Sequence, residues 1–161
     1  MKKSALLLGV ALAMAAGPAM AQTYRHELSI FGNWTRLKQS GETIGVSILN
    51  VDYGYYFTPQ LVGTLGVSRF STDGMGSTDA MLGGKYYFGV GRRDSYLWYV
   101  DGGIGTTKTA GDRGQRWELG GGLAYMITES TSFNIGIDWY GIKTTPGTLG
   151  TIIGMGFTTR F

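Results

Sequence analysis

The sequence predicts an all-β protein that folds as an eight-stranded antiparallel up-and-down transmembrane β-barrel. Three observations lead to this fold class. Apolar and polar residues alternate with a period of two in eight segments, which is the pattern of strands with one apolar face. Glycine supplies 28 of the 161 residues and aromatic residues 13%, a composition that suits strands and turns better than helices. The aromatic residues gather at the segment ends, as the two interfaces of a bilayer select.

In the first four predicted strands, most apolar residues occupy alternate positions and therefore share one face. In the first, Leu28 and Ile30 alternate with Glu27. In the second, Ile48 has the opposite parity to Leu49 and Val51, so we expect a β-bulge or a twist near its start. The four predicted ranges are 23–34, 43–57, 61–70 and 77–88.

The last four predicted strands follow the same rule. Trp98 and Val100 alternate with Tyr99, and Ile135 and Ile137 alternate with polar neighbours. These ranges are 95–105, 116–127, 132–141 and 151–161. Turn-rich connections join all eight strands, and they occupy residues 36–42, 58–60, 71–76, 89–94, 107–114, 128–130 and 143–147.

Residues 1–21 have the features of a cleaved secretory signal peptide. Lys2 and Lys3 precede a short apolar run, and Ala19 and Ala21 form a small-residue cleavage site. The apolar run is shorter than the ~20 residues of a spanning helix. The mature chain, residues 22–161, is then a single barrel domain whose formal charge falls from +3 to +1 without the two lysines. That charge gives no indication of nucleic-acid binding.

The polar face carries isolated charges among small residues, which indicates a narrow interior rather than a solvated surface. Unpaired burial of charge is costly, so we expect these groups to pair inside the barrel. Arg160 and Glu27 are a candidate pair, because their strands should meet at the seam. The predicted interior charge network is Arg25, Glu27, Asp52, Lys85, Asp101, Arg116, Glu118, Asp138 and Arg160, with Asp79 on the same face.

Aromatic residues predict two girdles that frame an apolar outer face. A soluble eight-stranded barrel also alternates, but its core has no reason to sort Tyr and Trp by height. One girdle comprises Tyr24, Tyr55, Tyr86, Trp98 and Tyr125, and the other comprises Trp34, Trp117 and Trp139. The apolar face should therefore contact lipid. Four tyrosines on the polar face, Tyr56, Tyr87, Tyr99 and Tyr140, favour an interior plugged by side chains.

The last strand carries Ile153, Met155, Phe157 and Phe161 on one parity, and the segment GYYFTPQL looks like a short turn after an aromatic-ending strand. In these features the chain resembles the small outer-membrane barrels of the OmpA/OmpX type. The resemblance implies an outer-membrane location and a monomer that needs periplasmic chaperones. It also implies that Phe157 and Phe161 form a carboxy-terminal signal for the barrel-assembly machinery.

We interpret the chain as a non-enzymatic integral membrane protein that contributes to envelope integrity or cell-surface interaction. A narrow ion channel and a lipid-A-modifying enzyme are the alternatives. His26, the sole histidine, has the opposite parity to Glu27 and Ser29, so these three residues should not converge as a catalytic triad. We expect no cofactor and no metal site. Cations near the outer connections could contact lipopolysaccharide phosphates; they are Arg36, Lys38, Arg69, Lys108, Arg113 and Lys143.

Overall fold

The computed structural model describes residues 24–39, 42–72, 75–89, 95–109, 112–143 and 148–161. For residues 34–39, 42–46, 72, 75, 109, 112 and 148–149 it describes the backbone alone. The predicted signal peptide therefore lies outside the described residues. The described part of the chain contains no helix with the length and hydropathy of a membrane span.

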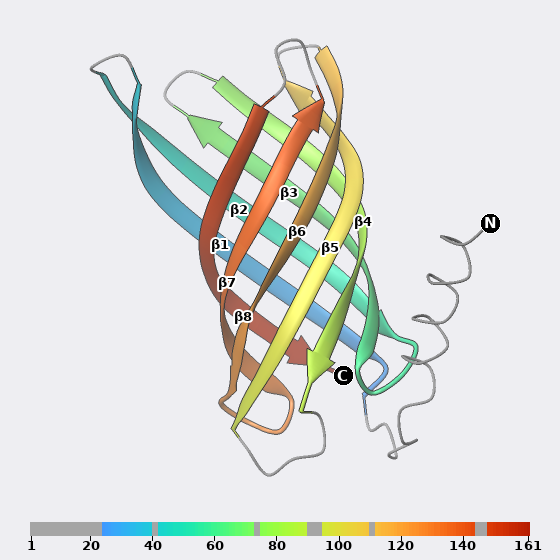
Figure 1. The fold of residues 1–161 in the computed structure, drawn as a ribbon. Coiled ribbons are helices and arrows are strands. Elements are labelled where there is room, and N and C mark those ends of the chain that lie inside the picture. Colours follow the sequence, from blue (N-terminus) through green and yellow to red (C-terminus); the bar gives the residue numbers. More distant parts are fainter. Residues whose placement is uncertain (1–23, 40–41, 73–74, 90–94, 110–111, 144–147) are drawn as a thin grey trace, which may run out of the picture.

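Eight tilted strands form one closed barrel in which each strand pairs with its neighbours in the sequence and β8 returns to β1 (Figure 1). All pairings are antiparallel. The predicted fold class, an eight-stranded antiparallel up-and-down barrel, is confirmed. The strands are β1 (His26–Gln39), β2 (Glu42–Tyr56), β3 (Leu61–Thr72), β4 (Met75–Phe88), β5 (Tyr96–Thr109), β6 (Asp112–Met126), β7 (Thr131–Lys143) and β8 (Thr148–Arg160).

The bulge expected near the start of β2 is not present. The register between β1 and β2 runs without interruption from His26↔Tyr55 to Gln39↔Glu42, and that between β2 and β3 is equally continuous. Ile48 therefore faces the interior, where it lines a cavity, while Leu49 faces outward. The change of apolar parity marks an apolar residue inside the barrel rather than a backbone irregularity.

The strands are longer at one end of the barrel than the sequence indicates. β1 ends at Gln39 and β2 begins at Glu42, so most of the predicted connection 36–42 belongs to strands. The same holds for 71–76 and 107–114. We call this end, where β1–β2, β3–β4, β5–β6 and β7–β8 join, the hairpin end. Hydrogen-bonded pairing continues there beyond the apolar residues that signalled a strand.

The opposite end, which we call the turn end, holds two short turns of the same construction. The Thr58 hydroxyl accepts a hydrogen bond from the backbone N–H of Leu61 at 3.0 Å. The Thr128 hydroxyl accepts one from the N–H of Thr131 at the same distance. These side chains replace the missing backbone partners in the turns. Phe161 also lies at this end, because its backbone N–H donates to the carbonyl of His26 at 2.9 Å.

The seam between β1 and β8 closes the barrel through a shorter ladder than the other pairings. The paired residues run from Glu27↔Arg160 to Gly32↔Met155. Where this ladder stops, the Asn33 side-chain amide donates to the backbone carbonyl of Ile153. A side chain thus satisfies one edge carbonyl at the point where strand pairing ends.

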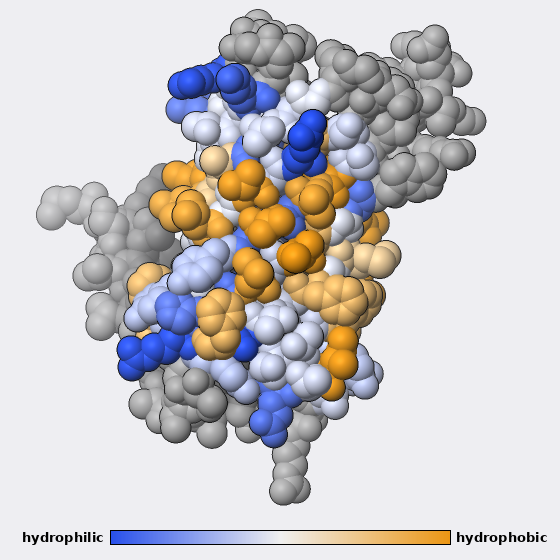
Figure 2. All heavy atoms as spheres, turned by 180° about the vertical axis from the view of Figure 1, so that it is seen from behind, coloured by the Kyte–Doolittle hydropathy of each residue, from blue (hydrophilic) through white to orange (hydrophobic). Residues whose placement is uncertain are grey.

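The two faces of the sheet differ sharply in polarity. Outward residues are mostly apolar and exposed, among them Leu65, Leu82 and Ile104, which are 59–70% exposed. Figure 2 shows an apolar band across the middle of the visible face, with hydrophilic side chains above and below it. The inward face buries Glu27, Asp79, Lys85, Arg116 and Arg160. A water-soluble barrel would have the reverse arrangement, so the outer face is suited to hydrocarbon.

Candidate functional site

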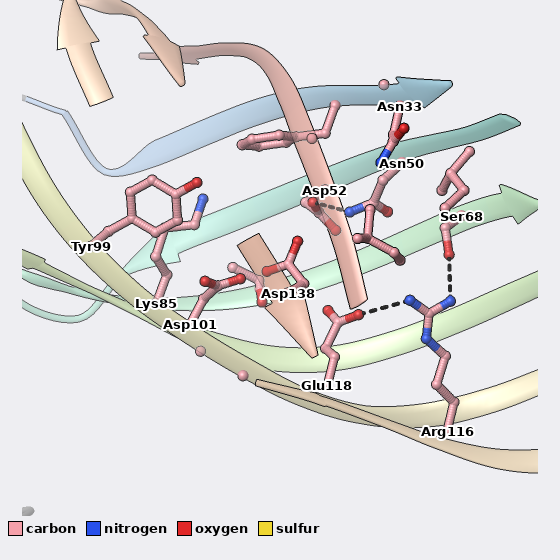
Figure 3. Close-up of a pocket in the computed structure, with 18 residues that line it drawn as sticks. Asn33, Asn50, Asp52, Ser68, Lys85, Tyr99, Asp101, Arg116, Glu118 and Asp138 are labelled. Carbon is pink, nitrogen blue, oxygen red and sulfur yellow. Dashed lines mark hydrogen bonds and ion pairs between the residues drawn. The ribbon is translucent and has the colours of Figure 1, made fainter. Parts of the chain in front are cut away.

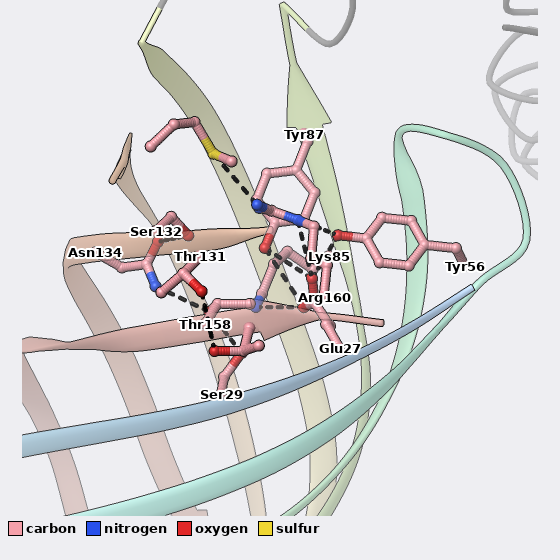
Figure 4. Close-up of polar contacts among 12 residues, drawn as sticks. Glu27, Ser29, Tyr56, Lys85, Tyr87, Thr131, Ser132, Asn134, Thr158 and Arg160 are labelled. Atoms are coloured by element: carbon pink, nitrogen blue, oxygen red, sulfur yellow. Dashed lines mark hydrogen bonds and ion pairs between the residues drawn. The ribbon is translucent and has the colours of Figure 1, made fainter. Parts of the chain in front are cut away.

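The interior of the barrel is the candidate site, and its turn end is filled by one polar cluster. Glu27, Tyr56, Lys85, Tyr87 and Arg160, which we call the plug, are each at most 8% exposed (Figure 4). Glu27 accepts hydrogen bonds from Lys85 Nζ at 3.0 Å and from the Tyr56 hydroxyl at 2.6 Å. The Tyr87 hydroxyl donates to the same carboxylate at 3.1 Å.

Arg160 completes the plug across the seam. Its Nε donates to the Tyr56 oxygen at 2.8 Å and lies 4.0 Å from Glu27 Oε2. Its guanidinium stacks over the Tyr87 ring with a separation of 5.1 Å. Glu27 and Arg160 are directly opposite each other on β1 and β8, which brings the pair together as the sequence suggested. Two cations, one carboxylate and two hydroxyls therefore form one connected buried network, in which Arg160 Nη2 has no hydrogen-bond partner among the described residues.

Short polar side chains extend the network along the seam. The Ser29 and Thr158 hydroxyls are 2.7 Å apart, and the Asn134 amide donates to Thr158 Oγ1 at 2.8 Å. Ser132 in turn donates to Asn134 Oδ1 at 3.1 Å. All four residues are buried. Their chain of hydrogen bonds joins β1, β8 and β7 from inside the barrel.

A second charged cluster surrounds Arg116 nearer the hairpin end. Its guanidinium pairs with Asp79 and, at 3.1 Å, with Glu118. The Phe70 ring centroid lies 4.6 Å from the guanidinium carbon and that of Tyr140 lies 5.2 Å from it. Arg116 is 4% exposed and Asp79 fully buried. The two aromatic rings, which also contact each other, help to hold the cation in position.

Between the two clusters lies a cavity of about 70 Å³ in which acidic side chains outnumber basic ones (Figure 3). Asp52, Asp101, Glu118 and Asp138 line it together with Lys85 and Arg116. Lys85 is bonded to Glu27 in the plug, and Arg116 is bonded to Asp79 and to Glu118, so Asp52, Asp101 and Asp138 have no ion pair with a described residue. The space suffices for roughly five water molecules, since one needs about 10–15 Å³.

Carboxylates outnumber cations in the described interior. Six carboxylates, Glu27, Asp52, Asp79, Asp101, Glu118 and Asp138, share the space with the three cations Lys85, Arg116 and Arg160. Asp52 accepts a hydrogen bond from the Asn50 amide at 2.7 Å. Asp101 keeps one buried oxygen without a hydrogen-bond partner among the described residues. The excess negative charge gives the cavity an electrostatic preference for cations.

The predicted interior residues fall into three groups. Glu27, Lys85 and Arg160 meet in the plug, and Arg116 meets Glu118. Asp52, Asp101 and Asp138 line the cavity. Arg25 differs from the prediction, because it precedes β1, is exposed, and forms no ion pair with a described residue. The alternation does not apply to it, since the strand begins at His26.

The predicted girdle residues lie on the outer face where their side chains are described. Tyr55, Trp98, Trp117, Tyr125 and Trp139 are exposed, and Tyr24 and Tyr86 are half-buried. The Trp34 side chain lies outside the described part. His26 also faces outward, where its ring stacks on Phe161 at 5.8 Å and approaches the Tyr53 hydroxyl. Glu27 and Ser29 face inward, so the three do not form a triad.

Sequence reasoning missed several residues of the interior. Phe31 and Ser68 line the cavity, and Phe70 stacks on Arg116. Parity alone could have placed all three on the inner face. No pattern in the sequence indicates that Arg116 on β6 pairs with Asp79 on β4, because another strand lies between them. Among the described residues, no three His, Cys, Asp or Glu side chains are grouped so that they could hold a metal ion.

No family model matches the chain. No curated protein matches it. Among solved structures it is similar to Neisserial surface protein A, with a TM-score of 0.70 and 11% identity over 84% of this chain and 97% of that chain. It is also similar to the N-terminal β-barrel domain of Pseudomonas aeruginosa OprF, with a TM-score of 0.67 and 18% identity over 86% and 98% of the two chains.

The outer membrane enzyme PagL has the same fold at a TM-score of 0.55 and 14% identity, over 84% of this chain and 99% of that chain. The fold therefore accommodates an enzyme as well as surface proteins and does not by itself define an activity. Because these identities are low, the likeness establishes the fold. Together with the apolar outer band, it shows that the chain has the fold of the small eight-stranded outer-membrane β-barrels, the fold that the resemblance to the OmpA/OmpX type implied.

Proposed function

We propose that this protein is a non-enzymatic integral outer-membrane barrel that contributes to envelope integrity or cell-surface interaction and has a plugged interior. The observation that carries the proposal is the plug. Five large or charged side chains from β1, β2, β4 and β8 fill the turn end and bond to one another. An eight-stranded barrel is just wide enough for side chains to fill. An ion would have to displace a hydrogen-bonded cluster to cross it.

We further propose how the protein reaches the outer membrane and which molecules surround it there. The predicted signal peptide, residues 1–21, directs export, and periplasmic chaperones and the barrel-assembly machinery deliver a monomer to the outer membrane. The turn end then faces the periplasm and the hairpin end faces outward, the orientation of a barrel whose chain ends are periplasmic. The surrounding lipid bilayer and lipopolysaccharide are the permanent partners.

Planar-bilayer recording tests the plug. The refolded wild-type protein should show no discrete conductance, whereas Tyr56→Ala/Tyr87→Ala should conduct, because two buried rings leave the turn end. Tyr53→Ala/Tyr96→Ala is the matched control, since both of these tyrosines are exposed on the outer face. If Tyr56→Ala/Tyr87→Ala folds correctly, as shown by its gel mobility, but shows no discrete conductance, the proposal is contradicted.

The acidic cavity supports a narrow cation channel as the second candidate function. In that case the wild-type protein itself conducts, and Asp101→Asn/Asp138→Asn lowers its preference for K⁺ over Cl⁻. Both residues line the cavity and neither pairs with a cation within the described residues. Discrete wild-type conductance with this dependence would replace the plugged barrel by the channel.

A further inference from the structure

A row of cations crosses the outer wall just beyond the apolar band at the hairpin end. Arg69, Thr78, Lys108 and Arg113 are consecutive cross-strand partners on β3, β4, β5 and β6. All four are exposed, as is Lys143 on β7. Arg69 lies four residues from Leu65, and Lys108 lies four from Ile104. Because side chains alternate along a strand, the cations point outward like these apolar residues. Lys143 pairs with Gln115, two residues nearer the apolar band than Arg113. We call Arg69, Lys108 and Arg113 the basic row.

The outer wall changes polarity in steps toward this row. One set of cross-strand partners, Leu65, Leu82, Ile104 and Trp117, is apolar and exposed. The set two residues further along each strand is Val67, Ala80, Thr106 and Gln115. The basic row follows after another two residues, about 13 Å along the strands from the apolar set. Strand tilt reduces this height, which places the cations in the headgroup layer of a bilayer.

The cations are arranged in a way that favours a bound anion. Lys108 and Arg113 are directly opposite each other, which puts their Cβ atoms about 5 Å apart. Like charges in this position destabilise a sheet unless something compensates them. None of the three cations of the row forms an ion pair with a carboxylate whose side chain is described. A phosphate group between Lys108 and Arg113 would accept hydrogen bonds from both.

We propose that the basic row binds the phosphates of a lipopolysaccharide molecule whose acyl chains lie on the apolar set below. This inference rests on the proposed function, because it requires the hairpin end to face the outer leaflet. Arg69 and Arg113 are three strand spacings apart, or about 14 Å. The lipid A disaccharide carries a phosphate on each sugar and can reach both ends of the row, which a phospholipid with one phosphate cannot. Thr78 adds a neutral donor between Arg69 and Lys108.

Binding to purified lipopolysaccharide tests the proposal. Wild-type protein and Lys108→Gln/Arg113→Gln are refolded in uncharged detergent, mixed with lipopolysaccharide and separated by gel filtration, and bound lipid is quantified. Because both cations would donate charge-assisted hydrogen bonds to the phosphate, the double variant should bind roughly tenfold more weakly or worse. Arg25→Gln is the matched control, since Arg25 is an exposed cation outside the row. It should bind like the wild type.

Lipid variants identify the ligand. Dephosphorylated lipopolysaccharide should bind the wild-type protein as weakly as the intact lipid binds the double variant. Equal binding of intact lipid by both proteins, or equally tight binding of phosphatidylglycerol, overturns the proposal. Insertion into lipid vesicles, followed by protease protection, is measured on the same samples. Failure to insert contradicts the proposed function, whereas normal insertion without a loss of lipid binding contradicts the basic row alone.

Discussion

Glu27 lies between two cations and two tyrosine hydroxyls and supplies the single carboxylate of the plug. In Glu27→Gln the shape is retained, but Lys85 and Arg160 become two buried cations without a counterion. Removing one partner of a buried pair costs about 3–5 kcal/mol, so the free energy of unfolding should fall by that amount. Urea unfolding of the refolded barrel, followed by tryptophan fluorescence, measures the change.

Two further variants serve as controls for this prediction. Glu129→Gln removes a carboxylate from the exposed turn between β6 and β7 and should leave the unfolding midpoint unchanged. Lys85→Met in the Glu27→Gln background removes one unbalanced cation and should restore part of the stability. Equal midpoints for wild type and Glu27→Gln would mean that the plug is not held by this charge.

The residue scale is also where the sequence is most informative. Alternation places Glu27, Asp52 and Asp138 inside and Trp98 and Ile135 outside, because a strand turns successive side chains to opposite faces. It does not reveal that Arg116 contacts Asp79. Partners across the lumen depend on closure and stagger of the barrel, and no local pattern encodes either. Arg25 was misplaced because parity has no meaning beyond the first residue of a strand.

At the scale of the element, Gly54 on β2 leaves room for the side chain of Glu27 on the neighbouring strand. A Cβ at Gly54 would lie 2.6 Å from Glu27 Cγ and 2.6 Å from Val62 Cγ1. Gly54→Ala should therefore push Glu27 out of the plug and destabilise the barrel by about 1–3 kcal/mol, as overpacking does. Urea unfolding measures the change in the free energy of unfolding.

Gly32→Ala is the matched control within the same sheet. The nearest atom to a Cβ at Gly32 is the carbonyl oxygen of Ile48, at 3.9 Å. This substitution meets no obstacle and should keep the wild-type midpoint. If both variants unfold at the same urea concentration, close packing of Glu27 against β2 does not matter for stability.

Element boundaries illustrate a limit of the sequence pattern. The turns at Thr58 and Thr128 were predicted, because each contains residues that favour turns, and the turn at Thr58 also follows an aromatic-ending strand. At the hairpin end the predicted connections were too long. Apolar alternation reflects contact with lipid and fades at the headgroup layer, whereas backbone pairing needs no apolar residue. Lys108 and Arg113 are thus paired strand residues that composition alone suggested were loops.

At the scale of the whole molecule, Phe161 allows the proposed recognition by the assembly machinery to be tested separately from folding. In the folded protein its backbone N–H donates to the His26 carbonyl, its own carbonyl accepts from His26 N–H at 2.9 Å, and its ring stacks on His26. Phe161→Ala keeps both backbone hydrogen bonds and loses the ring. Purified Phe161→Ala should therefore refold in detergent with a midpoint close to that of the wild type. If the assembly machinery recognises the ring, folded protein in the outer membrane of expressing cells should fall several-fold.

Comparing refolding in detergent with assembly in cells separates an effect on stability from an effect on recognition. Folded protein is measured by the difference in gel mobility between heated and unheated membrane fractions, and the unfolding midpoint by urea titration of the refolded barrel. Tyr125→Ala, which removes an exposed aromatic side chain from the turn end of β6, controls for loss of interfacial area and should assemble normally in cells. If Phe161→Ala reduces the amount of folded protein equally in cells and in detergent, the ring stabilises the seam between β1 and β8. Recognition by the assembly machinery requires a loss confined to cells, because only there does a partner contact the strand before the barrel has closed.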